Sequence, residues 1–212
     1  MKRTLLLTLC AAAMTAAGIG TAFAGSPTPA VEEPPVIVPA AAPEIWDGAY
    51  VGATFGSRAG GDMTYTPGPS YASLEPGQSA GLFGGYNFQN GNMVYGGELA
   101  YSRVNAPGFG AVGFPGETFD YFFDAKLRAG VAMDNVLLYG FAGFSSSTYD
   151  DTFSFWNVSG ANYGLGMDIK MGDNFFAGAE YIIRNLSGDT NNPGQVQDTT
   201  IQALQLRAGW KF

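Results

Sequence analysis

Charged side chains recur at alternate positions of otherwise apolar segments, and they are the residues best placed to do chemistry. Five of them lie about five or six residues from the nearest short turn or from the C-terminus: Glu98, Arg128, Asp168, Glu180 and Arg207. In paired strands, equal spacing from the turns predicts a shared depth. The same alternation puts further charges on the same face, namely Asp120, Asp124, Lys126, Lys170, Arg184 and Lys211.

Opposite charges crowded into a narrow space are expected to pair, because an isolated buried charge is costly. We therefore predict a network of ion pairs, with Glu98 against Arg128 and Glu180 against Arg207 on adjacent strands. The sequence leaves open an alternative, in which these side chains are separately hydrated in a water-filled interior.

The residue types do not indicate a catalytic site. The chain has no histidine, the usual general base of hydrolases and acyltransferases. The serines at 145–147 have no base nearby, and the glycine-rich segments 81–85 and 90–97 follow no strand-to-helix unit that would hold a phosphate. The oxygen-rich segments 47–50 and 187–198 lack the spacing of a calcium loop. We predict a non-enzyme without cofactor or metal; an unusual serine or carboxylate site remains the alternative.

The elements that carry these charges are alternating apolar and polar runs of the kind that form β-strands. Short turns rich in Asn, Asp and Gly are predicted at 89–92, 133–135 and 172–174, and longer connections at 58–78, 105–116, 149–158 and 187–198. No helical period is present after the first 24 residues. Eight strands are predicted, at about 46–57, 79–89, 93–104, 117–132, 136–148, 159–171, 175–186 and 199–212.

The N-terminal segment indicates export. Two cations, a long apolar stretch and Ala22-Phe23-Ala24 before Gly25 are typical of a secretory signal peptide, which we expect to be removed after Ala24 together with the single cysteine, Cys10. Residues 25–44 are proline-rich and are predicted to form an extended tether. The remaining residues, 45–212, form the predicted strand domain.

Composition favours lipid as the medium around the strands. Only 13% of residues are charged whereas 14% are aromatic, and the charged faces also carry many glycines. A soluble sandwich or lipocalin-like barrel would also alternate, but charge and glycine fit a narrow interior, and aromatics near strand ends fit membrane interfaces. The predicted fold is all-β: an eight-stranded, antiparallel, up-and-down transmembrane β-barrel. The net charge of −8 argues against nucleic acid as a partner.

The segment "IWDGAYVGATFG" after a proline-rich spacer and the terminal "LRAGWKF" resemble the first and last strands of the alphaproteobacterial outer-membrane β-barrel family, which includes immunogenic and opacity-type surface proteins. The resemblance covers about residues 45–212. The family is related in architecture to the small OmpA/OmpX-type barrels. It implies that Trp210 and Phe212 belong to the signal read by the outer-membrane insertion machinery. It also implies the outer membrane of a Gram-negative bacterium as the location, with lipid and lipopolysaccharide as neighbours.

Two functions remain for such a barrel: a structural protein that presents loops to the outside, including to an extracellular protein ligand, or a small channel of low conductance. Because eight strands leave room only for side chains, the first is preferred. The short turns, both ends of the barrel and the tether are expected in the periplasm, with sites of external proteolysis near 58–78 or 149–158. Phe153, Phe155 and Trp156 are predicted at the outer rim, either as part of an interfacial aromatic belt or as a contact surface.

Overall fold

A computed structural model of the chain describes residues 45–212 apart from 69–70, 106–111 and 113–116. The predicted signal peptide and tether, residues 1–44, lie outside the described residues. No helix in the described part is long and apolar enough to cross a membrane.

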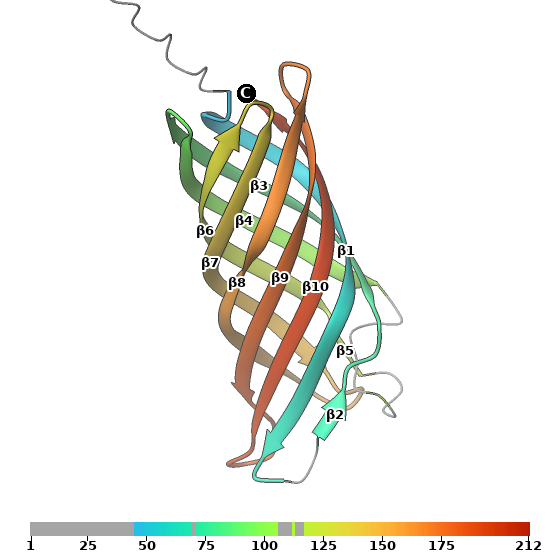
Figure 1. The fold of residues 1–212 in the computed structure, drawn as a ribbon. Coiled ribbons are helices and arrows are strands. Elements are labelled where there is room, and N and C mark those ends of the chain that lie inside the picture. The colour runs from blue at the N-terminus through green and yellow to red at the C-terminus, as the bar shows by residue number, and fades with distance from the viewer. Residues whose placement is uncertain (1–44, 69–70, 106–111, 113–116) are drawn as a thin grey trace, which may run out of the picture. The chain divides into compact units, whose positions relative to one another are not determined.

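Eight long antiparallel strands pair around a closed ring, in the order β1, β3, β4, β6, β7, β8, β9, β10 and back to β1 (Figure 1). Two short strands, β2 and β5, pair with β1 and β7 outside this ring. The predicted all-β, antiparallel ring of eight strands is confirmed. The strand bounds are β1 Gly48–Thr66, β2 Tyr71–Ser73, β3 Gln78–Asn90, β4 Met93–Asn105, β5 Thr118–Phe119, β6 Tyr121–Met133, β7 Val136–Asp150, β8 Phe155–Met171, β9 Phe175–Asp189 and β10 Val196–Lys211.

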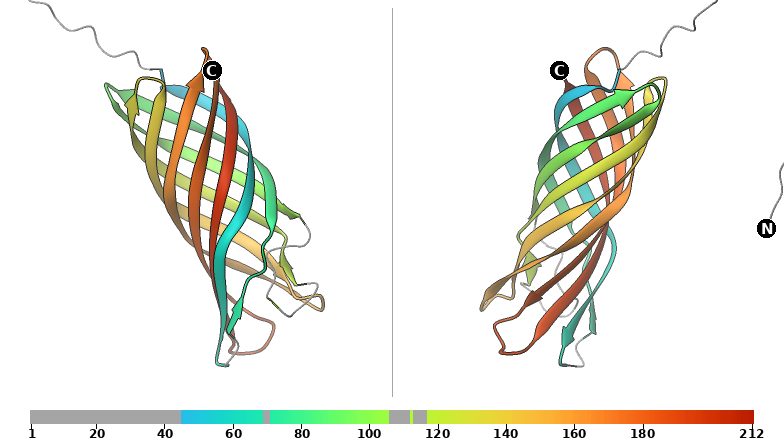
Figure 2. Two further views of the ribbon diagram at one scale, coloured as in Figure 1. Left: turned by 45° about the vertical axis from the view of Figure 1, so that its right-hand side comes forward. Right: turned by 90° about the vertical axis from the view of Figure 1, so that its left-hand side faces the viewer.

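The three predicted short turns are present at one end of the barrel, between β3 and β4, β6 and β7, and β8 and β9. Gly91 and Gly172 have φ angles of 57° and 72°, and Asp134 has 49°, so each turn contains a residue in the left-handed conformation that tight hairpins require. Figure 2 shows the C-terminus at this same end and the longer hairpins projecting from the other. We call these the turn end and the outer end.

The strands extend further toward the outer end than the sequence predicted. β1 continues to Thr66, paired with β10 up to Val196, although 58–78 was expected to be a loop. β7 and β8 pair up to Asp150 and Phe155, which leaves only residues 151–154 between them. The expectation of long, protease-sensitive loops at 58–78 and 149–158 is therefore wrong for the paired portions, since a protease needs an unpaired, extended segment.

The sequence missed these strand extensions because the apolar side chains change faces along a strand: they point outward near the turn end and inward near the outer end. In the turn-end half of β10, Leu204 and Leu206 are exposed on the outside and Arg207 is buried inside. In its outer half, Asp198 is exposed on the outside while Ile201 is fully buried. Across the strands, the outer half therefore buries an apolar cluster inside, although β10 itself also buries the polar Gln197 and Thr199 there.

An apolar band surrounds the turn-end half of the ring. Large apolar side chains such as Leu82, Leu127 and Leu165 are exposed on it. Exposed aromatics flank the band on both sides, with Tyr86, Phe88, Tyr95, Phe175, Trp210 and Phe212 toward the turn end, and Phe55, Tyr101, Phe123, Phe144, Tyr163 and Tyr181 toward the outer end. This arrangement fits a bilayer with two interfaces. Tyr139 is another aromatic near a predicted strand end, so the sequence predicted that it lies at a membrane interface. This is wrong, because Tyr139 is buried inside the barrel.

Glycines inside the ring make room for large side chains on the neighbouring strand. Gly166 on β8 lies opposite Tyr139 on β7, and a Cβ at Gly166 would come within 2.2 Å of the Tyr139 ring. Gly140, on the outer face of β7, has its nearest neighbour, a Leu165 methyl, at 3.5 Å. The two glycines are close in the sheet but face opposite media, which makes them a matched pair.

We predict that Gly166→Ala lowers the free energy of unfolding by about 1–3 kcal/mol, because the added methyl forces Tyr139 to move in a filled interior. Gly140→Ala should change it by less than about 0.5 kcal/mol, since its methyl meets only ordinary contacts. Urea titration of the refolded protein, followed by the mobility shift of unboiled samples on gels, measures both. Equal effects would mean that the interior tolerates added volume.

Candidate functional site

A layer of ion pairs crosses the interior, and Glu98 on β4 is its centre. The buried Glu98 carboxylate accepts hydrogen bonds from Lys126 at 3.2 Å, from Arg128 at 3.0 Å and from Arg207 at 2.6 Å. Lys126 and Arg128 come from the adjacent strand β6, whereas Arg207 comes from β10. Glu98 therefore ties neighbouring strands together and also joins them to strands beyond its own hydrogen-bonded partners.

Two further carboxylates complete the layer. Glu180 on β9 accepts from Arg207 at 2.9 Å and from Lys126. Asp168 on β8 lies 3.0 Å from Arg128 and 3.2 Å from Arg207. Three carboxylates thus face three cations, and the layer is neutral when all six are charged.

Aromatic rings fill the space around these charges. The Tyr50 hydroxyl donates to Glu98 at 3.0 Å and accepts from Arg128 at 2.8 Å. The Arg128 guanidinium lies 3.8 Å from the centre of the Tyr139 ring, and that of Arg207 lies 4.0 Å from the centre of Phe83. Guanidinium groups suit such a site, because they stack on ring faces while their edges donate to carboxylates.

A second ion pair lies apart from this layer. Arg184 on β9 donates to Asp124 on β6 through two nitrogens, at 2.9 Å and 2.6 Å. Ser145 on β7 also donates to Asp124, at 2.6 Å, and Asn162 donates to Ser145 at 2.8 Å. Neither charged side chain has another ion-pair partner among the described residues, although the Lys126 charge also acts on Asp124. This is therefore the simplest ion pair of the interior to test.

The structure brings most of the predicted charged residues together. Glu98 meets Arg128 and Glu180 meets Arg207, as the spacing predicted, but Lys126 and Asp168 join the same network and link the two pairs. These contacts are direct, which differs from the alternative of separately hydrated side chains. Lys170 and Lys211 lie instead at the turn end, where Lys170 donates to the Ile45 carbonyl at 3.2 Å.

The prediction that Asp120 faces the interior is wrong. Asp120 is exposed and lies between β5 and β6. Phe119 and Phe122 are both buried, so two residues separate successive inward side chains and the alternation slips by one position. A parity count that begins in the regular part of β6 cannot detect this irregularity.

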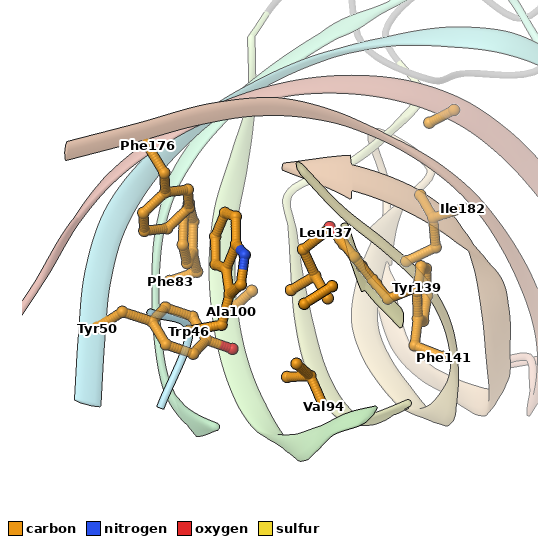
Figure 3. Packing of buried hydrophobic residues seen from close by; sticks show 12 residues of the cluster. Trp46, Tyr50, Phe83, Val94, Ala100, Leu137, Tyr139, Phe141, Phe176 and Ile182 are labelled. Atoms are coloured by element: carbon orange, nitrogen blue, oxygen red, sulfur yellow. The ribbon is translucent and has the colours of Figure 1, made fainter. Parts of the chain in front are cut away.

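Trp46 closes the turn end of the interior. This role was not predicted, and the only signal for it in the sequence is a tryptophan just before the first strand. Its side chain is 3% exposed and packs on Phe176 with ring centres 6.2 Å apart. Figure 3 shows the indole beside Phe83, Phe176 and Tyr50. The Trp46 backbone N–H donates to the Gln89 side-chain oxygen at 2.8 Å. Gly48, with a φ of 113°, lets the chain turn from this cap into β1.

An apolar cluster fills the outer half of the interior. It includes Met63, Phe119, Phe122, Tyr149, Trp156 and Ile201. Trp156 is only 8% exposed, and its indole N–H donates to Gln197. The prediction that Trp156 belongs to an exposed rim contact is therefore wrong: its position in β8 points it inward.

Phe153 and Phe155 are exposed, at 95% and 72% respectively. They do not belong to the outer aromatic girdle, because β7 carries polar side chains on its outer face after Phe144, up to Asp150. Asp150 lies about 20 Å further along the strand than Phe144, or about 15 Å in height for a tilted strand. The belt interpretation therefore fails for both residues, and the contact interpretation remains.

Trp210 and Phe212, the predicted insertion signal, lie on the outer face of the last strand at the turn end, and both are exposed. Trp210 pairs with Val51 of β1, and the Phe212 N–H donates to the Ala49 carbonyl at 2.9 Å. The C-terminal strand thus closes the ring, while a role of these side chains in insertion stays a prediction.

Several known proteins are similar to this chain. A family model described as "Outer membrane protein beta-barrel domain" matches residues 36–212. The 25 kDa outer-membrane immunogenic proteins of Brucella abortus and Brucella canis are 32% and 31% identical over 85% of this chain and 87% of theirs. Among solved structures, Neisserial surface protein A is 17% identical with a TM-score of 0.49, over 78% of this chain and 97% of that one. Ail of Yersinia pestis is 18% identical with a TM-score of 0.44, over 78% and 99%.

The Asp124–Arg184 pair yields a prediction about stability. Asp124→Ala should lower the free energy of unfolding by about 3–5 kcal/mol, because it leaves Arg184 buried without its carboxylate. Combining it with Arg184→Ala should recover part of that loss, since the stranded charge is removed as well. A double-mutant cycle in urea measures this coupling.

The same cycle at Glu180 and Arg207 serves as the comparison. Its double variant should recover less, because it leaves Lys126 and Asp168 without one of their partners. If the double variant loses as much free energy of unfolding as the Asp124→Ala and Arg184→Ala variants together, these two side chains do not stabilise one another.

Proposed function

This chain is a small outer-membrane β-barrel protein of the outer membrane protein β-barrel domain family, and we propose that it is a non-enzymatic structural protein that presents its outer hairpins at the cell surface. Its role would be to strengthen the membrane and to act as a surface antigen or adhesin.

The observation that carries this proposal is the filled interior. Trp46 and its aromatic neighbours occupy the turn end, the ion-pair layer around Glu98 crosses the middle, and the cluster around Trp156 fills the outer half. Each layer is made of side chains that contact one another directly. Such a barrel is suited to bear load in a membrane and poorly suited to pass solutes.

The outer hairpins support surface presentation. They continue beyond the apolar band as paired strands with polar outer faces, so they hold their tips away from the lipid. The Brucella relatives are named as immunogenic proteins of the outer membrane, which is the property expected of a protein with exposed tips.

Several expectations from the sequence are part of the same proposal. The signal peptide is cleaved after Ala24, residues 25–44 form a periplasmic tether, and the terminal strand with Trp210 and Phe212 is read by the insertion machinery. The apolar band contacts lipid, and the polar faces above it contact lipopolysaccharide.

Surface presentation predicts a clear labelling pattern. The mature protein would lack cysteine, so single cysteines report their own location. Asn191→Cys, in the exposed β9–β10 connection, should react with a membrane-impermeant maleimide on intact cells. Asp173→Cys, in the exposed β8–β9 turn, should react only after the outer membrane is permeabilised. The reverse pattern would refute the orientation and the surface role.

The second candidate, a narrow channel, is tested by recording from planar bilayers. Because three side-chain layers block the interior, the purified protein should give no steady openings of uniform size at low voltage. Trp46→Ala should not change this, since the ion-pair layer remains closed behind the removed cap. Regular openings in the unmodified protein would favour the channel.

A further inference from the structure

The β7–β8 hairpin ends in a tip of unusual composition, which we define as residues 150–155 together with Glu117 and Asp120 beside it. Phe153 is the most exposed large apolar residue of the described chain, at 95%, and Phe155 is 72% exposed. Isolated exposed apolar residues are common, but two phenylalanines held together beyond a polar strand face expose apolar surface that lipid does not cover.

Hydrogen bonds within the tip hold its backbone in a defined turn. The Asp151 carboxylate accepts hydrogen bonds from the backbone N–H groups of Phe153 and Ser154, at 3.0 Å and 2.6 Å, and also from the Ser154 hydroxyl. Asp150 accepts from the Thr152 N–H at 2.9 Å. The backbone that carries the phenylalanines is therefore held by these bonds, which lowers the entropy cost of binding a partner.

Four carboxylates belong to the tip or to the segment paired beside it. Asp150 pairs with Thr118 of β5, which places Glu117 next to the hairpin, and the Asp120 N–H donates to the Thr148 carbonyl at 3.0 Å. None of the carboxylates of Glu117, Asp120, Asp150 and Asp151 forms an ion pair with a residue that the structure describes. A described cation, Arg103 on β4, pairs with Tyr121 of β6 and so lies close to Asp120 in the sheet.

The field at the tip is accordingly negative. Burial raises the pKa of the Glu117 carboxyl, and the charge of Asp151 adds to the rise although the Tyr149 hydroxyl donates a hydrogen bond to Glu117 at 2.6 Å. The interior does not offset this charge, since its ion pairs are balanced among themselves.

We propose that this tip is a docking surface for a cationic protein segment, one that places apolar side chains against Phe153 and Phe155 and Lys or Arg side chains against the surrounding carboxylates. The inference rests on the proposed surface role and gives it a partner class. Charge complementarity selects this partner, because an anionic polymer such as a sulfated glycan would be repelled by the same four groups.

The probe is a fluorescent octapeptide that alternates Lys and Leu, titrated by anisotropy against the full-length barrel in nanodiscs of zwitterionic lipid. Empty nanodiscs give the background. Octapeptides that alternate Lys with Ser, or Glu with Leu, separate the two contributions. We expect the Lys/Leu peptide to bind at least about ten-fold more tightly than either of the others, and the affinity to fall with added salt.

Two variants assign the binding to the tip. Phe153→Ser with Phe155→Ser should weaken it about ten-fold or more, as expected when apolar anchors are removed. The quadruple change Glu117→Gln, Asp120→Asn, Asp150→Asn and Asp151→Asn should do the same, while its amide oxygens keep the hydrogen bonds that shape the tip. The matched control, Asp134→Asn with Asp173→Asn in the short turns at the other end, should leave binding unchanged.

Equal binding of the Glu/Leu peptide or of heparin, or binding that survives both tip variants, would overturn the proposal. The cysteine labelling described above separates this failure from failure of the surface role. If Asn191→Cys reacts on intact cells and the tip still binds no cationic peptide, only the docking surface is refuted.

Discussion

The interior of an eight-stranded ring is so narrow that every charge inside it must meet an opposite charge on another strand, and this constraint governs the rest of the structure. Glu98 satisfies it by contacting three cations from β6 and β10 at once. Such convergence needs space, which the glycines opposite Tyr50 and Tyr139 provide. The ring size, the glycine content and the charge balance are therefore parts of one solution. Removing one partner of a pair would leave a carboxylate or a guanidinium buried without its opposite charge.

The reversal of polarity along the strands marks where the surrounding medium changes. Lipid favours apolar outer faces, so polar and charged residues turn inward, and this holds for β10 from Leu204 to Trp210. Beyond the interface water surrounds the sheet, so Asp198 turns outward and Ile201 inward. The ring continues through the change, because backbone pairing between β1 and β10 does not depend on the medium; the register shifts between Arg58 and Gly60, and pairing resumes beyond this irregularity. Continuous pairing is what holds the outer tips in place.

The sequence was sufficient for the ring and the short turns, and for the inward faces of its regular strands. Parity places Glu98, Arg128, Glu180 and Arg207 correctly, because strand alternation is strict wherever lipid lies on one side. It fails where the medium changes, so paired strands were mistaken for loops at 58–66 and 155–158. It also fails at Asp120, where a slip in the alternation depends on packing of Phe119 and Phe122 from separate strands. The cap formed by Trp46 was not predicted, since its partners lie on β3 and β9, far from it in sequence.

The balance of charges inside the barrel affects the electrostatic potential at its outer end. A barrel whose inner carboxylates and cations are matched contributes little field beyond its own walls, because opposite charges in contact cancel at a distance. The potential at the outer end is then determined by the charged side chains that project there, and on the β7–β8 tip these are the carboxylates of Asp150 and Asp151, with Glu117 and Asp120 beside them. The interior and the tips can consequently change independently: substitutions at the tips alter what the surface attracts without disturbing the ion pairs that hold the ring.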